Sequence, residues 1–238
     1  MKRLALCLFA IFAIGTTQAQ KKVKGNGNVT TITRTTSDYN TISCAGSFDY
    51  VLVKGTEGQI ILEGEANLLE YIVTEVKNER LIIKVENSAN LRTSSNKPIK
   101  ITIPFTDIEK VSFAGSGDLW NEDTIVSNHF DVEMAGSGDL KISVEANTVE
   151  ASLAGSGDLV LSGNTTSLEA SVAGSGDLEA YKLISNNTDV SVAGSGSAKV
   201  YSKEILKARV AGSGSVSYKG NPAKEDTKVS GSGRIRNN

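Results

Sequence analysis

Four aspartates recur at one position of a repeated motif. Asp118, Asp139, Asp158 and Asp177 each follow Gly-Ser-Gly, at intervals of 21, 19 and 19 residues. If the repeats stack, the backbones at these positions lie about 4.8 Å apart, where like charges repel by roughly 1 kcal/mol in water. A bound Ca²⁺ would offset this repulsion, since carboxylate and carbonyl oxygens are its usual ligands. The four aspartates are therefore candidate calcium ligands.

The alternative is that each carboxylate accepts hydrogen bonds from backbone N–H groups of its own corner, as turn aspartates commonly do. Ser197 and Ser215 take the same place in the next two copies of the motif, so the turn itself does not require a carboxylate. Calcium-binding solenoids also use a nine-residue repeat, which this chain lacks. We prefer the hydrogen-bonded interpretation and expect no cofactor.

Few other residues could do chemistry. The chain has one histidine, His129, so a Ser-His-Asp triad depends on that residue and a multi-histidine zinc site is excluded. Carboxylates that cleave polysaccharides must converge on one groove, and the repeated positions offer no such set. We expect His129 to lie in a solvated return loop and the protein not to be an enzyme.

The single tryptophan, Trp120, follows the first complete motif on an outward position. An exposed indole could stack on a sugar ring, because it combines a large apolar face with a polar edge. The alternative is that it packs under residues 121–128 or against the N-terminal half.

The motif that positions these residues occurs seven times. Self-similarity at a fixed period predicts one supersecondary unit per copy, stacked on its neighbours so that together they bury a common face. The copies are 18 to 21 residues apart and start at Ala114, Ala135, Ala154, Ala173, Ala193, Ala211 and Ser230.

Apolar residues alternate on both sides of each motif, which indicates a strand entering and a strand leaving it. The residues directly before the motif are Phe113, Met134, Leu153, Val172, Val192, Val210 and Val229, and those after it are Leu119, Leu140, Leu159, Leu178, Ala198, Val216 and Ile235. Two glycines around one small residue suit a tight corner with positive φ. The corner glycines are Gly115, Gly117, Gly136, Gly138, Gly155, Gly157, Gly174, Gly176, Gly194, Gly196, Gly212, Gly214, Gly231 and Gly233.

Two short strands, a tight corner and a looser return loop make a coil of about 19 residues. Equivalent strands of successive coils run parallel, and parallel crossovers are right-handed in almost all cases. The sequence therefore predicts an all-β protein, a right-handed parallel β-helix, with a rod of roughly 34 Å for seven coils.

Residues 1–19 have the features of a secretory signal peptide. Lys2 and Arg3 precede an apolar stretch, and small residues stand before the expected cleavage site at Gln20. No other segment is apolar enough to cross a membrane. We therefore expect an exported protein, located in the periplasm or at the cell surface.

The remaining chain is predicted to form one domain. Residues 20–38 are a lead-in, residues 39–110 form irregular N-terminal coils, and residues 111–238 form the regular repeats. Without residues 1–19 the chain has 23 basic and 27 acidic residues, a net charge of −4, which gives no electrostatic attraction to nucleic acid. Cys44 is then the single cysteine, predicted to be buried and unable to form an internal disulfide.

The N-terminal half carries a fainter copy of the plan. Residues 43–50, Ser-Cys-Ala-Gly-Ser-Phe-Asp-Tyr, align with residues 112–119, with Phe48 in place of the second glycine. We interpret this segment as an early coil. Further predicted elements are strands at 59–63, 81–86 and 99–104, a short helix at 66–71 and a polar loop at 87–98.

These residues also carry a resemblance. It is carried by three features: Phe48-Asp49-Tyr50-Val51, Ile101-Thr102-Ile103-Pro104 running into residues 108–111, and the serial Gly-Ser-Gly-Asp copies. Together they resemble the putative autotransporter adhesin, head GIN domain family. The resemblance covers residues 39–218. It implies an exported bacterial protein with a pectin-lyase-like β-helix, Gly-Ser-Gly at the sharp turns, no catalytic set and a role in adhesion.

We therefore expect an exported, non-enzymatic interaction module that binds a glycan or a protein of the envelope or the extracellular medium. One alternative is an enzyme acting on polysaccharide. Another is a structural protein that forms homo-oligomers through the open ends of its solenoid, although the charged run Arg234-Ile235-Arg236 argues against growth from that end.

Overall fold

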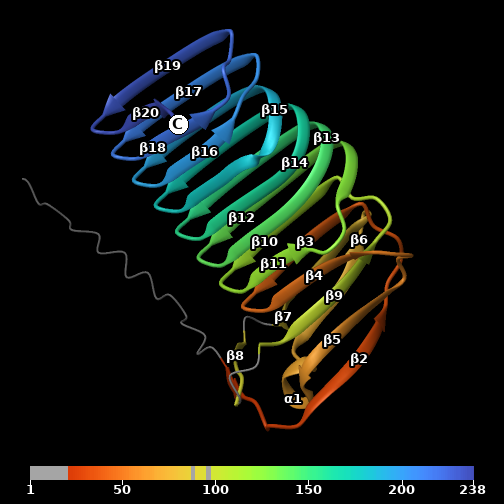
Figure 1. Cartoon of the computed structure of the whole chain (residues 1–238). Coiled ribbons are helices and arrows are strands. Elements are labelled where there is room, and N and C mark those ends of the chain that lie inside the picture. Colours follow the sequence, from red (N-terminus) through yellow and green to blue (C-terminus); the bar gives the residue numbers. More distant parts are fainter. Residues whose placement is uncertain (1–20, 87–88, 95–97) are drawn as a thin grey trace, which may run out of the picture.

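The protein is a single-chain β-solenoid in a computed structural model that describes residues 21–86, 89–94 and 98–238. It has about 7 turns, with about 19 residues between stacked parallel bridges, as the repeat predicts. The turns rise from an irregular N-terminal end to the C-terminus at the opposite end (Figure 1). The predicted signal peptide at 1–19 lies outside the described residues.

Each turn contributes one strand that enters the Gly-Ser-Gly corner and one that leaves it. We name the outer surface of the entering strands face A and that of the leaving strands face B. Face A is formed by β3 (Thr41–Gly46), β10 (Lys110–Gly115), β12 (Ile125–Gly136), the second halves of β13 (Asp139–Gly155), β14 (Asp158–Gly174) and β15 (Asp177–Gly194), then β17 (Ile205–Gly212) and β19 (Lys224–Gly231). Face B is formed by β4 (Asp49–Lys54), β11 (Asp118–Asn121), the first halves of β13, β14 and β15, then β16 (Ser197–Tyr201), β18 (Ser215–Lys219) and β20 (Arg234–Asn237).

The register confirms the alignment of the early coil. Ala45 pairs with Ala114 and Gly46 with Gly115 in β3 and β10, while Tyr50 pairs with Leu119 in β4 and β11. All pairings between these turns are parallel.

The predicted loose return loop is wrong for the middle turns. β13, β14 and β15 run for 17, 17 and 18 residues from one corner to the next without a break. Turns of nearly equal length let the bends stack, so that Val144 pairs with Gly163 inside the bend as regularly as elsewhere. Breaks occur in the last turns, after β16 and after β18. For the same reason His129 lies in strand β12 and not in a loop.

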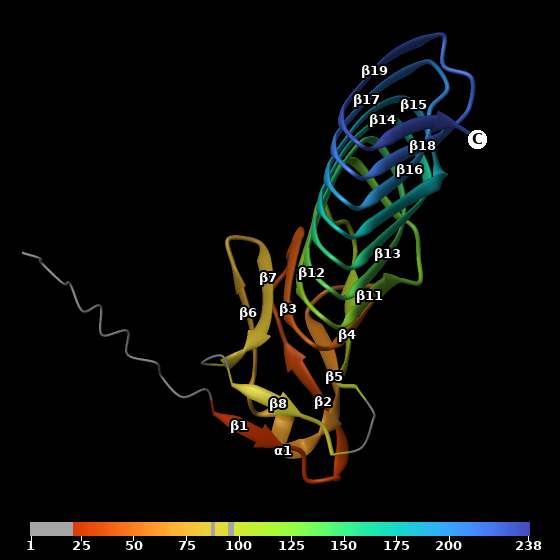
Figure 2. The ribbon, with the colours of Figure 1, turned by 90° about the vertical axis from the view of Figure 1, so that its left-hand side faces the viewer.

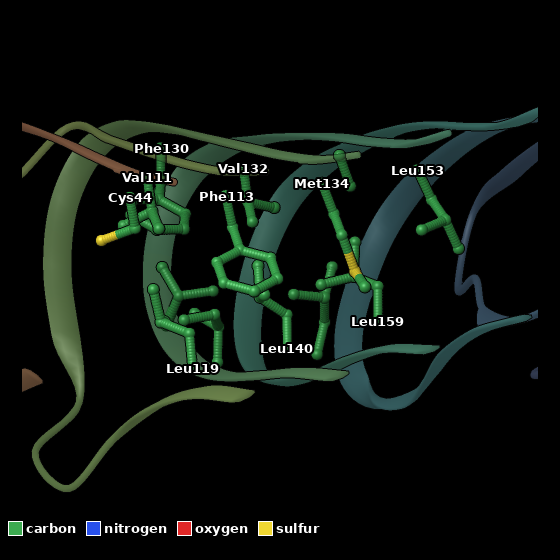
Figure 3. Packing of buried hydrophobic residues seen from close by; sticks show 14 of the residues in the cluster. Cys44, Val111, Phe113, Leu119, Phe130, Val132, Met134, Leu140, Leu153 and Leu159 are labelled. Carbon is green, nitrogen blue, oxygen red and sulfur yellow. The ribbon is translucent and has the colours of Figure 1, made fainter. Parts of the chain in front are cut away.

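The core consists of columns of apolar side chains between the two layers of strands (Figure 3). Phe113, Met134 and Leu153 succeed one another in the layer of face A, facing Leu119, Leu140 and Leu159 from the layer of face B, and all six are buried. Each fully buried side chain of this size stabilises the fold by about 1.5–3 kcal/mol. Cys44 continues the column and is buried, as predicted, and burial raises the pKa of its thiol.

At the C-terminal end the side chains of the inward columns become exposed. Every residue of β19 is exposed, and Val229, which follows Val210 in its column, is 42% exposed. In Figure 2 this last turn stands at the far end from the N-terminal strands.

The N-terminal end is closed differently, by antiparallel strands. β7 (Arg80–Val85) and β9 (Lys100–Phe105) still pair in parallel with β3 and β4. Beyond them β6 (Ile72–Lys77) pairs antiparallel with β7, β5 (Gln59–Glu65) with β9, and β2 (Val29–Thr35) with β5. Residues 39–110 are therefore only partly coils, which corrects the sequence interpretation.

Two local features account for this closure. Asn78 and Glu79 have φ of 51° and 57°, the combination that lets a two-residue turn join antiparallel strands. The guanidinium of Arg34 donates to the carbonyl oxygens of Leu69, at 2.7 Å, and of Ile72. It therefore covers part of the β6 edge, which protects the sheet from pairing with another chain.

The further elements predicted for the N-terminal half are present, except for the loop, while β1 (Lys22–Lys24), β2 and β6 were not predicted. The predicted strands correspond to β5, β7 and β9, and the predicted helix to α1 (Ala66–Leu69). The predicted loop at 87–98 contains a short strand, β8 (Asn90–Arg92), which pairs in parallel with β1. No helix within the described residues is long and apolar enough to span a bilayer.

A buried carboxylate fastens β1 and the segment after β8 to the rest of the fold. Glu65 is 2% exposed and accepts hydrogen bonds from the backbone N–H of Gly27 at 2.5 Å, from that of Ser94 at 2.8 Å and from the Ser94 hydroxyl. The Ser94 hydroxyl is the largest cause that holds the pKa of Glu65 below its ordinary value of 4.5.

We expect Glu65→Gln to lower the melting temperature at pH 7, because the amide keeps the size of the side chain but loses the charge that these donors stabilise. A carboxyl whose pKa is lowered by folding stabilises the folded state at a pH above its unfolded pKa. This stabilisation is lost as the pH falls through the pKa of the folded state. The difference in Tm between wild type and Glu65→Gln should thus vanish well below pH 4.5. A difference that stays constant from pH 7 to pH 2 would contradict this role.

Candidate functional site

The two glycines of each corner are required for different reasons. The first has positive φ in most turns, for example 137° at Gly136 and 134° at Gly155. The second does not, contrary to the sequence interpretation. A Cβ on Gly157 would lie 2.0 Å from the carbonyl oxygen of Gly138 in the preceding turn, so this glycine is required by the close approach of stacked backbones.

The corners are also hydrogen-bonded to one another. The backbone N–H groups of Ser156 and Gly157 donate to the carbonyl oxygen of Gly136, at 2.9 and 3.2 Å. The same pair of bonds recurs one turn later, from Ser175 and Gly176 to Gly155. The corner is therefore a rigid, repeated edge between face A and face B.

The aspartates form the predicted column along this edge on face B. Asp118, Asp139, Asp158 and Asp177 pair in register from turn to turn. Three of these carboxylates accept from the next turn and not from their own corner. The N–H of Asp139 donates to Asp118 at 3.3 Å, the N–H of Asp158 donates to Asp139 at 3.4 Å, and the N–H and hydroxyl of Ser197 donate to Asp177 at 2.9 and 2.8 Å. This corrects the expected donor.

Asp49 precedes these four in the column, because its neighbour Tyr50 pairs with Leu119. Burial raises the pKa of the Asp49 carboxyl, and the negative charge of Asp118 adds to the rise. The backbone N–H of Asp118 and the charge of Lys100 oppose it. The column thus has five carboxylates, one more than the complete motifs indicate.

We expect these carboxylates to need no metal. Among the described residues, no group of three or more His, Cys, Asp or Glu is placed to hold a metal ion, and Asp118, Asp139 and Asp177 already accept hydrogen bonds from the next turn. Millimolar Ca²⁺ or a chelator should leave the Tm unchanged. A Tm that rises with Ca²⁺ and falls with chelator would instead establish the column as a calcium site.

His129 and Trp120 are not brought together with other reactive groups. His129 is exposed, with its Nε2 atom 3.9 Å from the carboxylate of Glu150 on the next strand. Trp120 is half-buried on face B, between Val51 of the early coil and Lys141. Neither placement forms a catalytic set.

One hollow of about 550 Å³ lies where the N-terminal strands meet the first turns. Its lining includes no lysine or arginine among the described residues, but five carboxylates: Asp38, Glu57, Glu79, Asp107 and Glu109. Glu57 is committed to structure, because it accepts from the N–H of Tyr39 at 2.7 Å and of Thr106 at 3.1 Å. These residues come from scattered, unrepeated segments, so no sequence signal could have grouped them.

A second hollow, a trough of about 380 Å³, runs across face A over several turns. Its floor is made of small outward side chains, including Ala114, Ala135 and Ala154, beside the serine column at Ser152 and Ser171. The buried Phe113 and Met134 also border it. Because the small side chains leave the backbone nearly bare, the surface is flat and partly apolar.

Comparison with solved structures shows where this fold occurs. A putative adhesin from Bacteroides fragilis is 24% identical, with a TM-score of 0.83, and the match covers 91% of this chain and 100% of that one. A putative lipid binding protein from Parabacteroides distasonis is 27% identical, with a TM-score of 0.79, and covers 92% and 100%. A putative adhesin from the same species is 23% identical, with a TM-score of 0.73, and covers 92% and 100%.

A search of curated proteins finds no match. The family described as "Putative auto-transporter adhesin, head GIN domain" matches residues 38–222, which is most of the chain and includes the early coil, the aspartate column and six of the seven Gly-Ser-Gly corners. The protein therefore belongs to the auto-transporter adhesin head GIN domain family.

Proposed function

We propose that the protein is an exported, non-enzymatic adhesion module that presents the two flat faces of its solenoid to a glycan or protein outside the cytoplasm. The observation that carries this proposal is the family match over residues 38–222, joined to a rigid β-solenoid of the same fold as two putative adhesins. The signal-peptide features of residues 1–19 support export.

The faces suit such a role because adjacent turns hold their side chains in fixed rows. The backbone is hydrogen-bonded along both faces, so little conformational entropy is lost when a partner binds.

The experiment is a binding screen of residues 20–238 against glycans and extracellular matrix proteins, together with protease shaving of intact cells. The proposal predicts saturable binding to at least one class of surface and loss of the protein from shaved cells. Absence of binding, or release of reducing sugar from a polysaccharide in the screen, would overturn it.

A second candidate, lipid binding, is favoured by one observation. The 27%-identical neighbour is named a putative lipid binding protein, and the face A trough of about 380 Å³ has an apolar floor. If lipid binds there, Ala154→Glu should abolish co-sedimentation with phospholipid vesicles, whereas Ala154→Ser should not. Equal binding by both variants would remove this candidate.

A further inference from the structure

Face B changes its charge from one end of the solenoid to the other. In its first column the five aspartates from Asp49 to Asp177 give way to Ser197, Ser215 and Arg234. In the neighbouring column Glu179 gives way to Lys199, Ser217 and Arg236. The first column therefore changes from acidic to basic after β15, while the second, which holds Lys141 and Val160 before Glu179, has a single carboxylate and is basic beyond it.

The last three turns carry an excess of positive charge on this face. Their paired outward positions hold no carboxylate and are Ser197, Lys199, Tyr201, Ser215, Ser217, Lys219, Arg234 and Arg236. We call the four cations Lys199, Lys219, Arg234 and Arg236, with the tyrosines Tyr181 and Tyr201, the basic end.

Most of this charge is not neutralised within the described part of the chain. Lys199 lies 3.5 Å from Glu179, but no ion pair joins Lys219, Arg234 or Arg236 to a carboxylate among these residues. Arg236 is exposed and its Nε donates to the Ser217 hydroxyl at 3.1 Å, which uses one of its five N–H groups.

Aromatic hydroxyls lie beside the cations. The Lys219 ammonium is 4.5 Å from the centre of the Tyr181 ring, and the side-chain amide of Asn238 donates to the Tyr181 hydroxyl at 2.7 Å. Tyr201 pairs in register with Lys219 on the adjacent strand and is half-buried. The Lys219 ammonium and the two tyrosine side chains therefore lie side by side on face B.

We propose that the basic end binds an anionic polysaccharide, one whose sugars carry carboxylate or sulfate groups. The cations come from three successive turns. Lys199 and Arg236 share one column, two turns or about 9.6 Å apart, and Lys219 and Arg234 lie in the columns on either side of it, so together they form a cluster that can meet several charges of one chain. The tyrosine hydroxyls and those of the half-buried Ser197 and Ser215 supply partners for sugar hydroxyls. The aspartate column repels the same chain from the rest of face B and confines it to the last three turns.

This inference rests on the adhesion role proposed above and names the partner of that role. The test measures binding of polygalacturonate and of heparin, with dextran as the uncharged control, by biolayer interferometry. Polygalacturonate and heparin separate carboxylate from sulfate recognition. Binding to at least one of them should weaken steeply between about 50 and 300 mM salt, because exposed charges are screened over that range.

The variant Lys219→Ser/Arg234→Ser/Arg236→Ser should weaken binding at least tenfold. The matched control is Lys207→Ser/Lys224→Ser/Lys228→Ser, which removes the same charge from the same end of the solenoid but from face A. Thermal melts establish that both variants are folded. Equal losses in the two variants would show attraction to net charge alone and would overturn the proposal.

Asp177→Ser gives an independent test that does not remove a binding group. Serine already occupies this column at Ser197 and Ser215, so the variant should fold. Removal of the last carboxylate should raise the affinity for the bound polyanion several-fold. An unchanged or lower affinity would contradict the confining role of the column.

The remaining outcomes separate the two proposals. Binding of poly-glutamate but neither polysaccharide would favour an acidic protein partner and overturn the inference. If the protein adheres to cells or matrix but binds no polyanion, this inference fails and the adhesion role stands. If it does neither, both fail.

Discussion

Replacing Gly157 by alanine is expected to lower the stability of the protein by about 3 kcal/mol, the upper end of the usual cost of overpacking. The added Cβ would lie 2.0 Å from the carbonyl oxygen of Gly138 and 2.4 Å from the Cε of Met134. The methionine can move, but the carbonyl belongs to the backbone of the neighbouring turn, whose corner is held by the bonds from Ser156 and Gly157 to Gly136. Relief therefore requires the two turns to separate.

The control is Ser156→Ala at the same corner, where the side chain is exposed and the substitution removes one oxygen atom. A thermal melt followed by circular dichroism should show a Tm lowered by roughly 10 °C for Gly157→Ala and nearly unchanged for Ser156→Ala. Similar Tm values for the two variants would mean that the backbones are farther apart than described.

Truncation of a fully buried aromatic side chain in the regular turns should be equally severe. Phe130 is 0% exposed, in the strand β12 that joins the first complete turns. We expect Phe130→Ala to cost about 3–5 kcal/mol, since it removes buried apolar surface and leaves a cavity. Chemical denaturation monitored by fluorescence of Trp120 would measure the change.

The matched control lies at the open end of the solenoid. Val229 continues an inward column but is 42% exposed, so Val229→Ala should cost less than about 1 kcal/mol. The contrast tests whether the last turn is peripheral. A loss at Val229 as large as that at Phe130 would place the last turn inside a core or an interface.

Much of the fold follows from the repeat because a fixed period sets the register. Once Ala114 and Ala135 are equivalent, every residue of one turn has a known partner in the next, and the alignment of residues 43–50 extends this to the early coil. The inward columns, the aspartate column and the parallel pairing all depend on this one relation. None of them requires knowledge of the turn geometry.

The N-terminal strands could not be obtained in this way. β2 and β6 have no copy elsewhere in the chain, and their antiparallel pairing depends on tertiary contacts such as that of Arg34 with Leu69 and Ile72. The Asn78-Glu79 turn could have been suspected, since asparagine tolerates positive φ, but glutamate at the second position hides the signal.

The features of the candidate site also fall into those that follow from the repeat and those that do not. Lining up the repeats column by column shows aspartate replaced by serine and then Arg234, so the charge reversal on face B was available from the sequence. The sequence could not show that the donors to Asp118, Asp139 and Asp177 lie one turn away. Nor could it show that Lys219 lies over the ring of Tyr181, which is two turns away from it. Contacts between non-equivalent positions carry no periodic signal.

The most direct test of the account is disulfide cross-linking between turns. The hydroxyl oxygens of Ser152 and Ser171 are 3.2 Å apart on paired strands of face A, and Ser191 follows one turn later. In a protein of residues 20–238 that carries Ser152→Cys/Ser171→Cys, mild oxidation should form a disulfide between the two new cysteines, while the buried Cys44 stays unreactive. Ser152→Cys/Ser191→Cys should stay reduced, because a distance of about 9.6 Å across two turns exceeds what a disulfide spans. Efficient cross-linking of the second pair, or failure of the first, would contradict the stacked solenoid.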